Sequence, residues 1–396
     1  MRIDVFFDVY PHPAKPYFES QLAEWIRRGH RLRLFSLGGI PGASSEFPIT
    51  FIWTLRERPI RVALAVLSRC LTSPIRSWRT LWSECRLVPA IKTLAIDSQL
   101  PRNPPDAHFL QNLATAVSFS YLQCACPTTT LAIYYHGGEI PGVRQIPFEE
   151  SSRALGRAHV VFSNTRASVR EAIARGAPPE RTVRIPVGFP LERFKLPDNR
   201  SYLPDNCWRF VCLGRMAKEK GFDIALKAFA KLRSGTTHFT VTFIGDGPEL
   251  ANLQEFANRL GLQSNVRFLG HIASNLLVKL LANSDVLVVS SISIQGSNWA
   301  ETQATVMQEA MLMGAVVVAS NIGGIPESLP APFHRYLYTP NSTDELADRL
   351  SSLMTNSGKE LSSLGRIARQ FVEENYDIRI INERILAKIA SANSPP

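Results

Sequence analysis

Two glutamates, Glu301 and Glu309, lie around the expected start of a helix in the second half of the chain. Apolar residues at helical spacing, with Gly314 as a stop signal, predict a helix from about Gln303 to Met313. A helix start exposes unpaired backbone N–H groups and the positive end of the helix dipole, so it can bind a diphosphate. Carboxylates on either side can accept hydrogen bonds from sugar hydroxyls. The alternative is a solvated surface pair.

The loops after successive predicted strands carry residues suited to the same kind of ligand. In the second half of the chain, buried strands alternate with helices, which predicts a mostly parallel sheet covered by helices on both faces. Ligands of such sheets bind at the carboxyl ends of the strands. Arg215 and Lys220 follow the first of these strands and could hold a diphosphate, although cations in such loops are about as often only solvated. The later loops contribute Gly245, Gly247, Gly270, His271, Ile272, Ser290, Ser291, Ser320, Gly323 and Gly324.

Length and composition set the broad class. The 396 residues suggest two domains, and 45% hydrophobic with 20% charged residues is typical of a globular protein outside the membrane. No run of apolar residues is long enough to span a bilayer, and the N-terminus lacks a signal-peptide pattern, so we expect a cytoplasmic location. The six cysteines are expected to be reduced core thiols, and Cys124 and Cys126 have no partner pair at zinc spacing.

A basic segment near residues 54–86 supplies about half of the net charge of +10. Proline at position 74 separates two helical stripes of apolar residues within it. One interpretation is a surface that binds an anionic membrane. The other is that both stripes pack on the domain core while the arginines face water. Nucleic acid is disfavoured, because no recognised nucleic-acid-binding motif accompanies the charge. The stripes are Ile60, Leu64, Leu67 and Leu71, then Ile75, Trp78, Leu81, Trp82 and Cys85; the arginines are Arg56, Arg58, Arg61, Arg69, Arg76, Arg79 and Arg86.

Taken together, the motifs resemble those of retaining nucleotide-sugar-dependent glycosyltransferases of family four. The resemblance covers most of the chain and is strongest in the second half. There it rests on Gly214-Arg215, Lys220-Gly221-Phe222-Asp223, Ile244-Gly245-Asp246-Gly247-Pro248, Phe268-Leu269-Gly270-His271, Glu301 with Glu309-Ala310, and Gly323-Gly324-Ile325-Pro326-Glu327. The first half matches more loosely, through Arg28-Gly29-His30, His136-Gly137-Gly138 and Ile185-Pro186.

The resemblance implies an α/β fold of GT-B type, with two doubly wound Rossmann-like domains facing each other across a cleft. Residues 1–188 would form the acceptor-binding domain, 189–208 the linker and 209–375 the nucleotide-sugar-binding domain. A C-terminal helix over 376–392 would pack back toward the N-terminal domain. Within the family, the chain is most similar to transferases that build exopolysaccharide or lipid-linked oligosaccharide repeats.

The resemblance also implies roles for individual residues. Arg215 and Lys220 would neutralise the charge of the donor diphosphate. Glu301 would bind hydroxyls of the transferred sugar, and Glu309 would accept hydrogen bonds from the two ribose hydroxyls. His136 would face the donor. The remaining donor contacts would come from Gly214, Gly270, His271, Ile272, Ser290, Thr302, Gln303, Ala304 and Thr305. No Asp-x-Asp motif occurs, which agrees with a reaction that needs no metal or other cofactor.

The chain departs from the family pattern at three places. Many members have Gly-Phe-Gly-Leu after the first glutamate, where this chain has Thr302-Gln303-Ala304-Thr305. The usual paired-glycine loop after the first strand is replaced by Tyr10 to Pro16, which includes Lys15. The linker differs as well and reads Val187-Gly188-Phe189-Pro190. Two alternatives to transfer onto a lipid-linked saccharide therefore remain. The protein could glycosylate a soluble metabolite or isomerise a nucleotide sugar, or it could be a non-catalytic nucleotide-binding scaffold.

Overall fold

The computed structural model describes residues 1–11, 17–39, 45–53, 57–83, 87–137, 146–198, 200–233, 238–294 and 299–392, without the side chains of 87–89 and 205. The chain divides into two compact units. Unit 1 holds Met1–Gly137, Arg144–Gly188 and Ile378–Pro396, and unit 2 holds Phe189–Asp377. Lys15, Arg56, Cys85, Arg86 and Gly138, which the sequence analysis considers, lie outside the described residues.

Unit 1 is built on a seven-stranded sheet in the order β3-β2-β1-β4-β5-β6-β7. Every described pairing is parallel. The central strands are buried on both faces, which is why they read as continuous apolar runs. The strands are β1 (Arg2–Phe7), β2 (Arg31–Ser36), β3 (Ile49–Phe51), β4 (Ala107–Leu110), β5 (Thr130–Tyr135), β6 (Val160–Ser163) and β7 (Thr182–Arg184).

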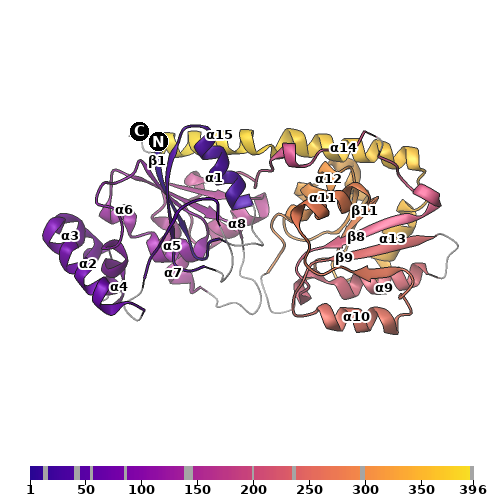
Figure 1. Ribbon diagram of the computed structural model, residues 1–396, viewed down its shortest axis with the longest axis horizontal. Helices are drawn as coiled ribbons and strands as arrows, with labels where there is room; N and C mark the ends of the chain where they lie inside the picture. Colours follow the sequence, from indigo (N-terminus) through magenta and orange to yellow (C-terminus); the bar gives the residue numbers. More distant parts are fainter. Residues whose placement is uncertain are drawn as a thin grey trace. The chain divides into compact units, whose positions relative to one another are not determined.

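Helices cover both faces of this sheet (Figure 1). The last helix of the chain lies beside the first, and the Trp25 indole N–H donates to Asn382 Oδ1 at 2.9 Å. The C-terminal segment thereby completes the core of the N-terminal unit. The helices are α1 (Tyr17–Arg27), α2 (Pro59–Thr72), α3 (Pro74–Trp82), α4 (Leu87–Asp97), α5 (Leu113–Phe119), α6 (Leu122–Ala125), α7 (Phe148–Gly156), α8 (Arg166–Ala174) and α15 (Ile378–Ser391).

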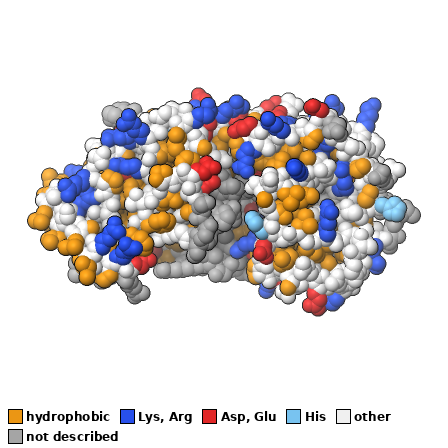
Figure 2. Space-filling model, in the orientation of Figure 1, with side chains coloured by type: hydrophobic (Ala, Val, Ile, Leu, Met, Phe, Trp, Pro, Cys, Tyr) orange, Lys and Arg blue, Asp and Glu red, His pale blue; other side chains and the backbone are white. Residues whose placement is uncertain are grey.

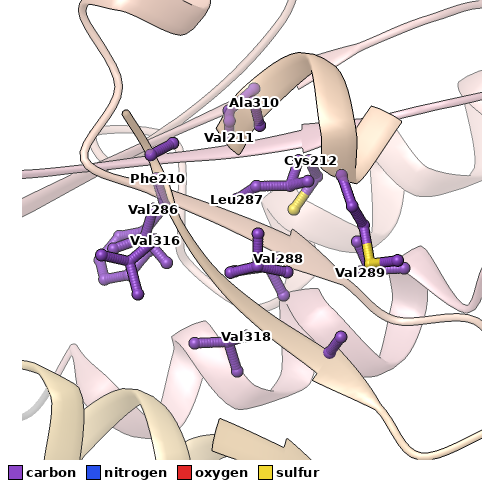
Figure 3. Close-up of a cluster of buried hydrophobic side chains, with 14 of the residues drawn as sticks. Phe210, Val211, Cys212, Val286, Leu287, Val288, Val289, Ala310, Val316 and Val318 are labelled. Atoms are coloured by element: carbon purple, nitrogen blue, oxygen red, sulfur yellow. The ribbon is translucent and has the colours of Figure 1, made fainter. Parts of the chain in front are cut away.

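Unit 2 contains a six-stranded sheet in the order β10-β9-β8-β11-β12-β13, and its described pairings are also parallel. Valine-rich strands form its centre; Figure 3 shows Val286 and Val288 of one strand near Val316 and Val318 of the next. The strands are β8 (Trp208–Leu213), β9 (Phe239–Ile244), β10 (Val266–Phe268), β11 (Val286–Val289), β12 (Val316–Ser320) and β13 (Leu337–Tyr338).

The helices of unit 2 pack on this sheet. They are α9 (Phe222–Leu232), α10 (Leu250–Arg259), α11 (Ser274–Ala282), α12 (Thr305–Leu312), α13 (Thr343–Leu353) and α14 (Gly358–Tyr376), and a short 3-10 helix, η4 (Lys218–Lys220), precedes α9. Helix α12 is followed by Gly314 with φ +74°. Its start is two residues later than predicted, because Ala304 takes the N-cap position.

The two doubly wound α/β sheets confirm the predicted fold class. The predicted break at Pro74 is also correct, since α2 ends at Thr72 and α3 begins at Pro74. No helix in the described part of the chain is long and apolar enough to cross a membrane. The five described cysteines are free thiols, of which Cys126 and Cys212 are buried.

One interpretation of the basic segment is wrong. The apolar stripes of α2 and α3 do not pack on the core: the side chains of Ile60, Leu64, Leu67, Leu71, Ile75, Trp78 and Trp82 are exposed. Two of the arginines, Arg69 and Arg76, point inward instead. In α2 and α3, these arginines therefore face the rest of unit 1, and the apolar stripes face solvent.

Candidate functional site

Backbone contacts join the loops at the carboxyl ends of the unit 2 strands. The Gly214 N–H donates to Ile244 C=O at 3.0 Å, which links the loops after β8 and β9. The Gly245 N–H donates to Gly270 C=O at 2.8 Å and links in the loop after β10. The Ser290 hydroxyl donates to Lys220 C=O at 2.8 Å and adds the loop after β11. Residues from four predicted loops thus form one connected edge of the sheet.

Gly221 fits this edge because its position admits no side chain. Its φ is +58°, a conformation that L-residues rarely adopt. A Cβ there would lie 2.1 Å from Ser290 C=O. The close approach fixes Lys220, the preceding residue, against the loop after β11.

An ion pair between Lys220 and Glu301 lies at the centre of the site. The Lys220 ammonium is 2.5 Å from Glu301 Oε2, and the Ser291 hydroxyl donates to the same oxygen at 3.0 Å. Their side chains are 26% and 12% exposed, so the pair is partly shielded and still open to a ligand. The structure thus brings together Lys220, Glu301 and Ser291, all of which the sequence predicted to lie in loops at this edge of the sheet.

The Gly323-Gly324 turn holds the backbone of Glu301. The Gly324 N–H donates to Glu301 C=O at 2.8 Å. Gly323 has φ +58°, and a Cβ there would lie 2.0 Å from that same carbonyl oxygen. The paired glycines after β12 therefore allow the turn to approach and position Glu301.

Helix α12 begins at Thr305, four residues after Glu301. Ala304 provides no side-chain cap, and the first turn contains no acidic residue, so the first backbone N–H groups have no side-chain acceptor from the cap. Gln303 and Ala304 are buried, whereas Thr302 and Thr305 are half-buried. This arrangement offers donors and a positive dipole end to an anion beside a carboxylate.

Glu309 lies further along α12 and is half-buried. Burial raises its pKa to about 7, and the charge of Arg193 opposes this shift. Near neutral pH the side chain can therefore be a hydrogen-bond donor or an acceptor. No described contact joins it to the Lys220–Glu301 pair.

The other predicted residues of unit 2 differ in their surroundings. Arg215 forms an ion pair with Glu219, which the sequence analysis did not single out. Glu219 is otherwise fixed, because its side chain is largely buried and its C=O accepts the Ile292 N–H at 3.0 Å. His271 is exposed, and Ile272 is partly buried against the core. An acid four residues after Arg215 was the available sequence signal for this pair.

His136 belongs to unit 1. Its ring stacks on Tyr134 with centroids 4.3 Å apart and an interplanar angle of 7°. It lines a narrow pocket together with Tyr17, Gln21, Gln111 and Asn382 among others. Sequence reasoning missed these neighbours, which come from elements far apart in the chain and have no common motif.

No three His, Cys, Asp or Glu side chains cluster as a metal site anywhere in the described ranges. The candidate site of unit 2 is instead a set of cations, backbone donors and carboxylates. Such a set can neutralise an anion and accept hydrogen bonds from hydroxyl groups.

Comparison with known proteins matches residues 198–371 to the family described as "Glycosyl transferases group 1". One curated relative is the GDP-mannose-dependent alpha-(1-6)-phosphatidylinositol monomannoside mannosyltransferase of Mycobacterium tuberculosis, 26% identical over 61% of this chain and 64% of that protein. Another is the 2-deoxystreptamine glucosyltransferase of Streptomyces kanamyceticus, 26% identical over 42% of this chain and 41% of that protein. The chain thus spans less than two thirds of the length of these relatives.

Among solved structures, Anabaena Alr3699/HepE in complex with UDP superposes with a TM-score of 0.72 and 20% identity, over 98% of this chain and 99% of that one. This likeness covers the fold of both units. Residues 198–371, which make up most of unit 2, are thus similar to the glycosyl transferases of group 1, and the structural likeness shows that both units share the fold of that neighbour.

Proposed function

We propose that the protein transfers a sugar from a nucleotide-diphosphate sugar to a saccharide acceptor carried on a lipid, within family four and with retention of configuration at the transferred carbon. The acceptor would belong to an exopolysaccharide or another cell-surface glycan, and the reaction would occur at the inner membrane face. The M. tuberculosis relative, named for a lipid-linked acceptor, supports this substrate class.

The observation that carries the proposal is the Lys220–Glu301 pair at the start of α12. In a glycosyl donor, a diphosphate and a sugar rich in hydroxyls lie side by side. The site offers a matching order: a cation, an uncapped helix start and a carboxylate whose backbone is held by glycines. A surface ion pair with no ligand would not need this convergence of loops.

The residues would act by exchanging partners. When donor binds, Lys220 and Arg215 turn from Glu301 and Glu219 toward the diphosphate, and Glu301 becomes free to accept from sugar hydroxyls. As the bond between the sugar and the diphosphate breaks, negative charge grows on the leaving phosphate oxygen. Because the two cations already face the diphosphate at that stage, they and the helix N–H groups stabilise the charge without further rearrangement. The leaving phosphate would take the proton of the attacking acceptor hydroxyl on the same face, which gives retention.

We further propose that neither a metal nor another cofactor takes part, since the two cations can supply the charge that a metal would bring. The test is to incubate the protein with UDP-, GDP- and ADP-sugars and a lipid-linked saccharide, with and without a chelator, and to assign the product anomer by NMR. The expected result is one accepted nucleotide, a retained anomer and a rate that the chelator leaves unchanged. An inverted product or loss of rate with chelator would refute the corresponding part.

A second candidate is transfer to a soluble metabolite, which the name of the S. kanamyceticus relative supports. It keeps the same donor site and changes only the acceptor. Turnover of a water-soluble acceptor with none on the lipid-linked saccharide would favour it. Binding of nucleotide without any turnover would favour a scaffold.

A further inference from the structure

Helices α2 and α3 of unit 1 present an apolar face to solvent. Seven large side chains on them, from Ile60 to Trp82, are 59–76% exposed. On α2 they recur at helical spacing, as Ile60, Leu64, Leu67 and Leu71. Figure 2 shows hydrophobic side chains gathered over these helices with basic side chains among them. We define this surface as the α2–α3 face. Single exposed apolar residues are common on protein surfaces, whereas a contiguous apolar face of this kind usually marks an interaction site.

The opposite side of the two helices is buried and, apart from Val62, polar. Arg76 pairs with Asp97 at 2.8 Å, and Arg69 lies 3.7 Å from the same carboxylate, which is fully buried. Arg69 also donates to the C=O of Asp97 at 2.8 Å and to that of Leu100. Ser77 and Thr80 are buried on this side of α3. Turning the leucines inward would therefore break a buried charge network, so the outward apolar face is built into the fold.

The charges on α2 and α3 indicate which kind of partner the α2–α3 face can bind. From Arg58 to Ser83 the chain contains no Asp or Glu. Arg61 and Arg79 are exposed on the two helices and take part in no ion pair within the described part of the chain. Arg79 also lines an open depression at the turn between the helices. A second copy of the chain, related by a twofold axis, would bring the same arginines near each other, which opposes self-association.

The two tryptophans support a lipid occupant. Trp78 and Trp82 lie one turn apart on the α2–α3 face, with ring centroids 5.4 Å apart. Tryptophan prefers the boundary between the headgroups and the acyl chains, where its ring is apolar and its N–H can reach polar groups. We propose that the α2–α3 face docks on an anionic lipid bilayer, with the leucines and tryptophans in the interface and Arg61 and Arg79 against lipid phosphates. This goes beyond the proposed sugar transfer, because it concerns a surface that bears no part of the donor site.

The structure also distinguishes the arginines that can contact lipid from those that cannot. A count of charges along the sequence treats all seven as equivalent, whereas Arg69 and Arg76 are held inward by Asp97. Docking through this face depends mainly on apolar insertion, and the two outward arginines add a preference for anionic headgroups. Binding should therefore weaken with salt and persist in part on neutral lipid.

The test is co-flotation of the full chain with phosphatidylcholine vesicles, with and without phosphatidylglycerol, in the absence of any sugar donor. The wild type should float with the mixed vesicles. Leu64→Gln with Leu67→Gln should weaken binding about tenfold or more, and Arg61→Gln with Arg79→Gln should remove the preference for phosphatidylglycerol. Emission of Trp78 and Trp82 should shift to shorter wavelength on binding.

Matched controls use exposed residues elsewhere. Leu276→Gln with Ile380→Gln, and Arg259→Gln with Lys279→Gln, should leave flotation unchanged. Circular dichroism of every variant checks folding. Wild-type protein that stays in solution with mixed vesicles overturns the proposal. So does a dimer that the Leu64 and Leu67 variants dissociate, because the face would then be an interface between copies. Both results leave the proposed use of a nucleotide sugar with retention untouched, because turnover tests it separately; absence of vesicle binding would count only against a reaction at the membrane face.

Discussion

At the scale of single residues, the site of unit 2 is held in a self-neutralised form. Lys220 and Glu301 satisfy each other at 2.5 Å, and Ser291 adds a neutral donor to the carboxylate. A ligand must therefore compete with an existing ion pair. A ligand that carries both negative charge and hydroxyl groups can replace the interactions that Lys220 and Glu301 lose. On the proposed function, this would favour binding of sugar nucleotides over simple phosphates.

The first prediction concerns Lys220. Replacing it with alanine should weaken the affinity for nucleoside diphosphates by about tenfold or more, because a charge-assisted hydrogen bond contributes on the order of 1.5–3 kcal/mol. Lys227→Ala is the matched control, because Lys227 pairs with Asp223 on α9 through side chains that are 43% and 44% exposed. Titration calorimetry measures both. Equal affinities for the two variants would mean that Lys220 does not contact the nucleotide.

The second prediction concerns Glu309. Burial raises its pKa from the ordinary 4.5 to about 7. The folded state therefore binds a proton that the unfolded chain releases, so this group lowers stability progressively as pH rises from about 4.5 to about 7. Above pH 7 the loss is complete and amounts to on the order of 3 kcal/mol.

Glu309→Gln removes this pH-dependent loss. The variant should melt several degrees above the wild type near pH 8, and the difference should shrink toward about pH 5. Scanning calorimetry across pH follows both proteins. Glu255→Gln, on the exposed side of α10, serves as the control and should show no such trend. A constant offset at all pH values would contradict the raised pKa.

At the scale of elements, the loops after the strands act as one unit because glycines let them touch. The third prediction is that Gly323→Ala displaces Glu301 and weakens donor binding about tenfold or more, since the new Cβ would overlap Glu301 C=O. Differential scanning fluorimetry with and without nucleotide should show a much smaller ligand-induced shift than in the wild type.

Gly29→Ala is the control for Gly323→Ala. Gly29 also has positive φ, but a Cβ there would meet nothing within 4 Å. It should cost only about 1–2 kcal/mol of stability from the left-handed backbone and leave the nucleotide-induced shift intact. If both variants kept that shift, the turn would not be what positions Glu301.

Sequence patterns predicted the elements best where local signals are strong. Apolar strands alternating with helices indicated the doubly wound sheet of unit 2, and Gly314 indicated the end of α12. The start of α12 was placed two residues early, because Ala304 is a weak cap signal.

Contacts between distant residues could not be predicted in the same way. The helices at 59–82 and their proline break followed from spacing, but the face that turns outward depends on Asp97, which lies 28 residues after Arg69. Likewise, Lys220 and Glu301 were each predicted as ligand contacts, whereas their pairing links positions 81 residues apart. Sequence motifs thus identified the residues of the candidate site, whereas only the tertiary structure showed which of them contact each other.

At the scale of the whole molecule, the C-terminal end of the chain belongs to the N-terminal unit. The chain leaves unit 1 after Gly188 and returns at Ile378, so that α15 packs into the core of unit 1. The corresponding limits predicted from the sequence are residues 188 and 376. Each unit has its own apolar core. Apart from His136, the residues proposed to bind the donor lie in unit 2, so damage to the core of unit 1 should leave nucleotide binding unaffected.

The fourth prediction uses this separation. Ile385 of α15 is buried, so Ile385→Ala should lower the unfolding free energy of unit 1 by about 2–5 kcal/mol. Ile380→Ala on the exposed side of the same helix should have little effect. Urea unfolding can be followed through Trp25, whose indole donates to Asn382. Nucleotide affinity, measured without urea, should match the wild type in both variants. A loss of affinity confined to Ile385→Ala would instead mean that the donor site depends on the core that α15 completes.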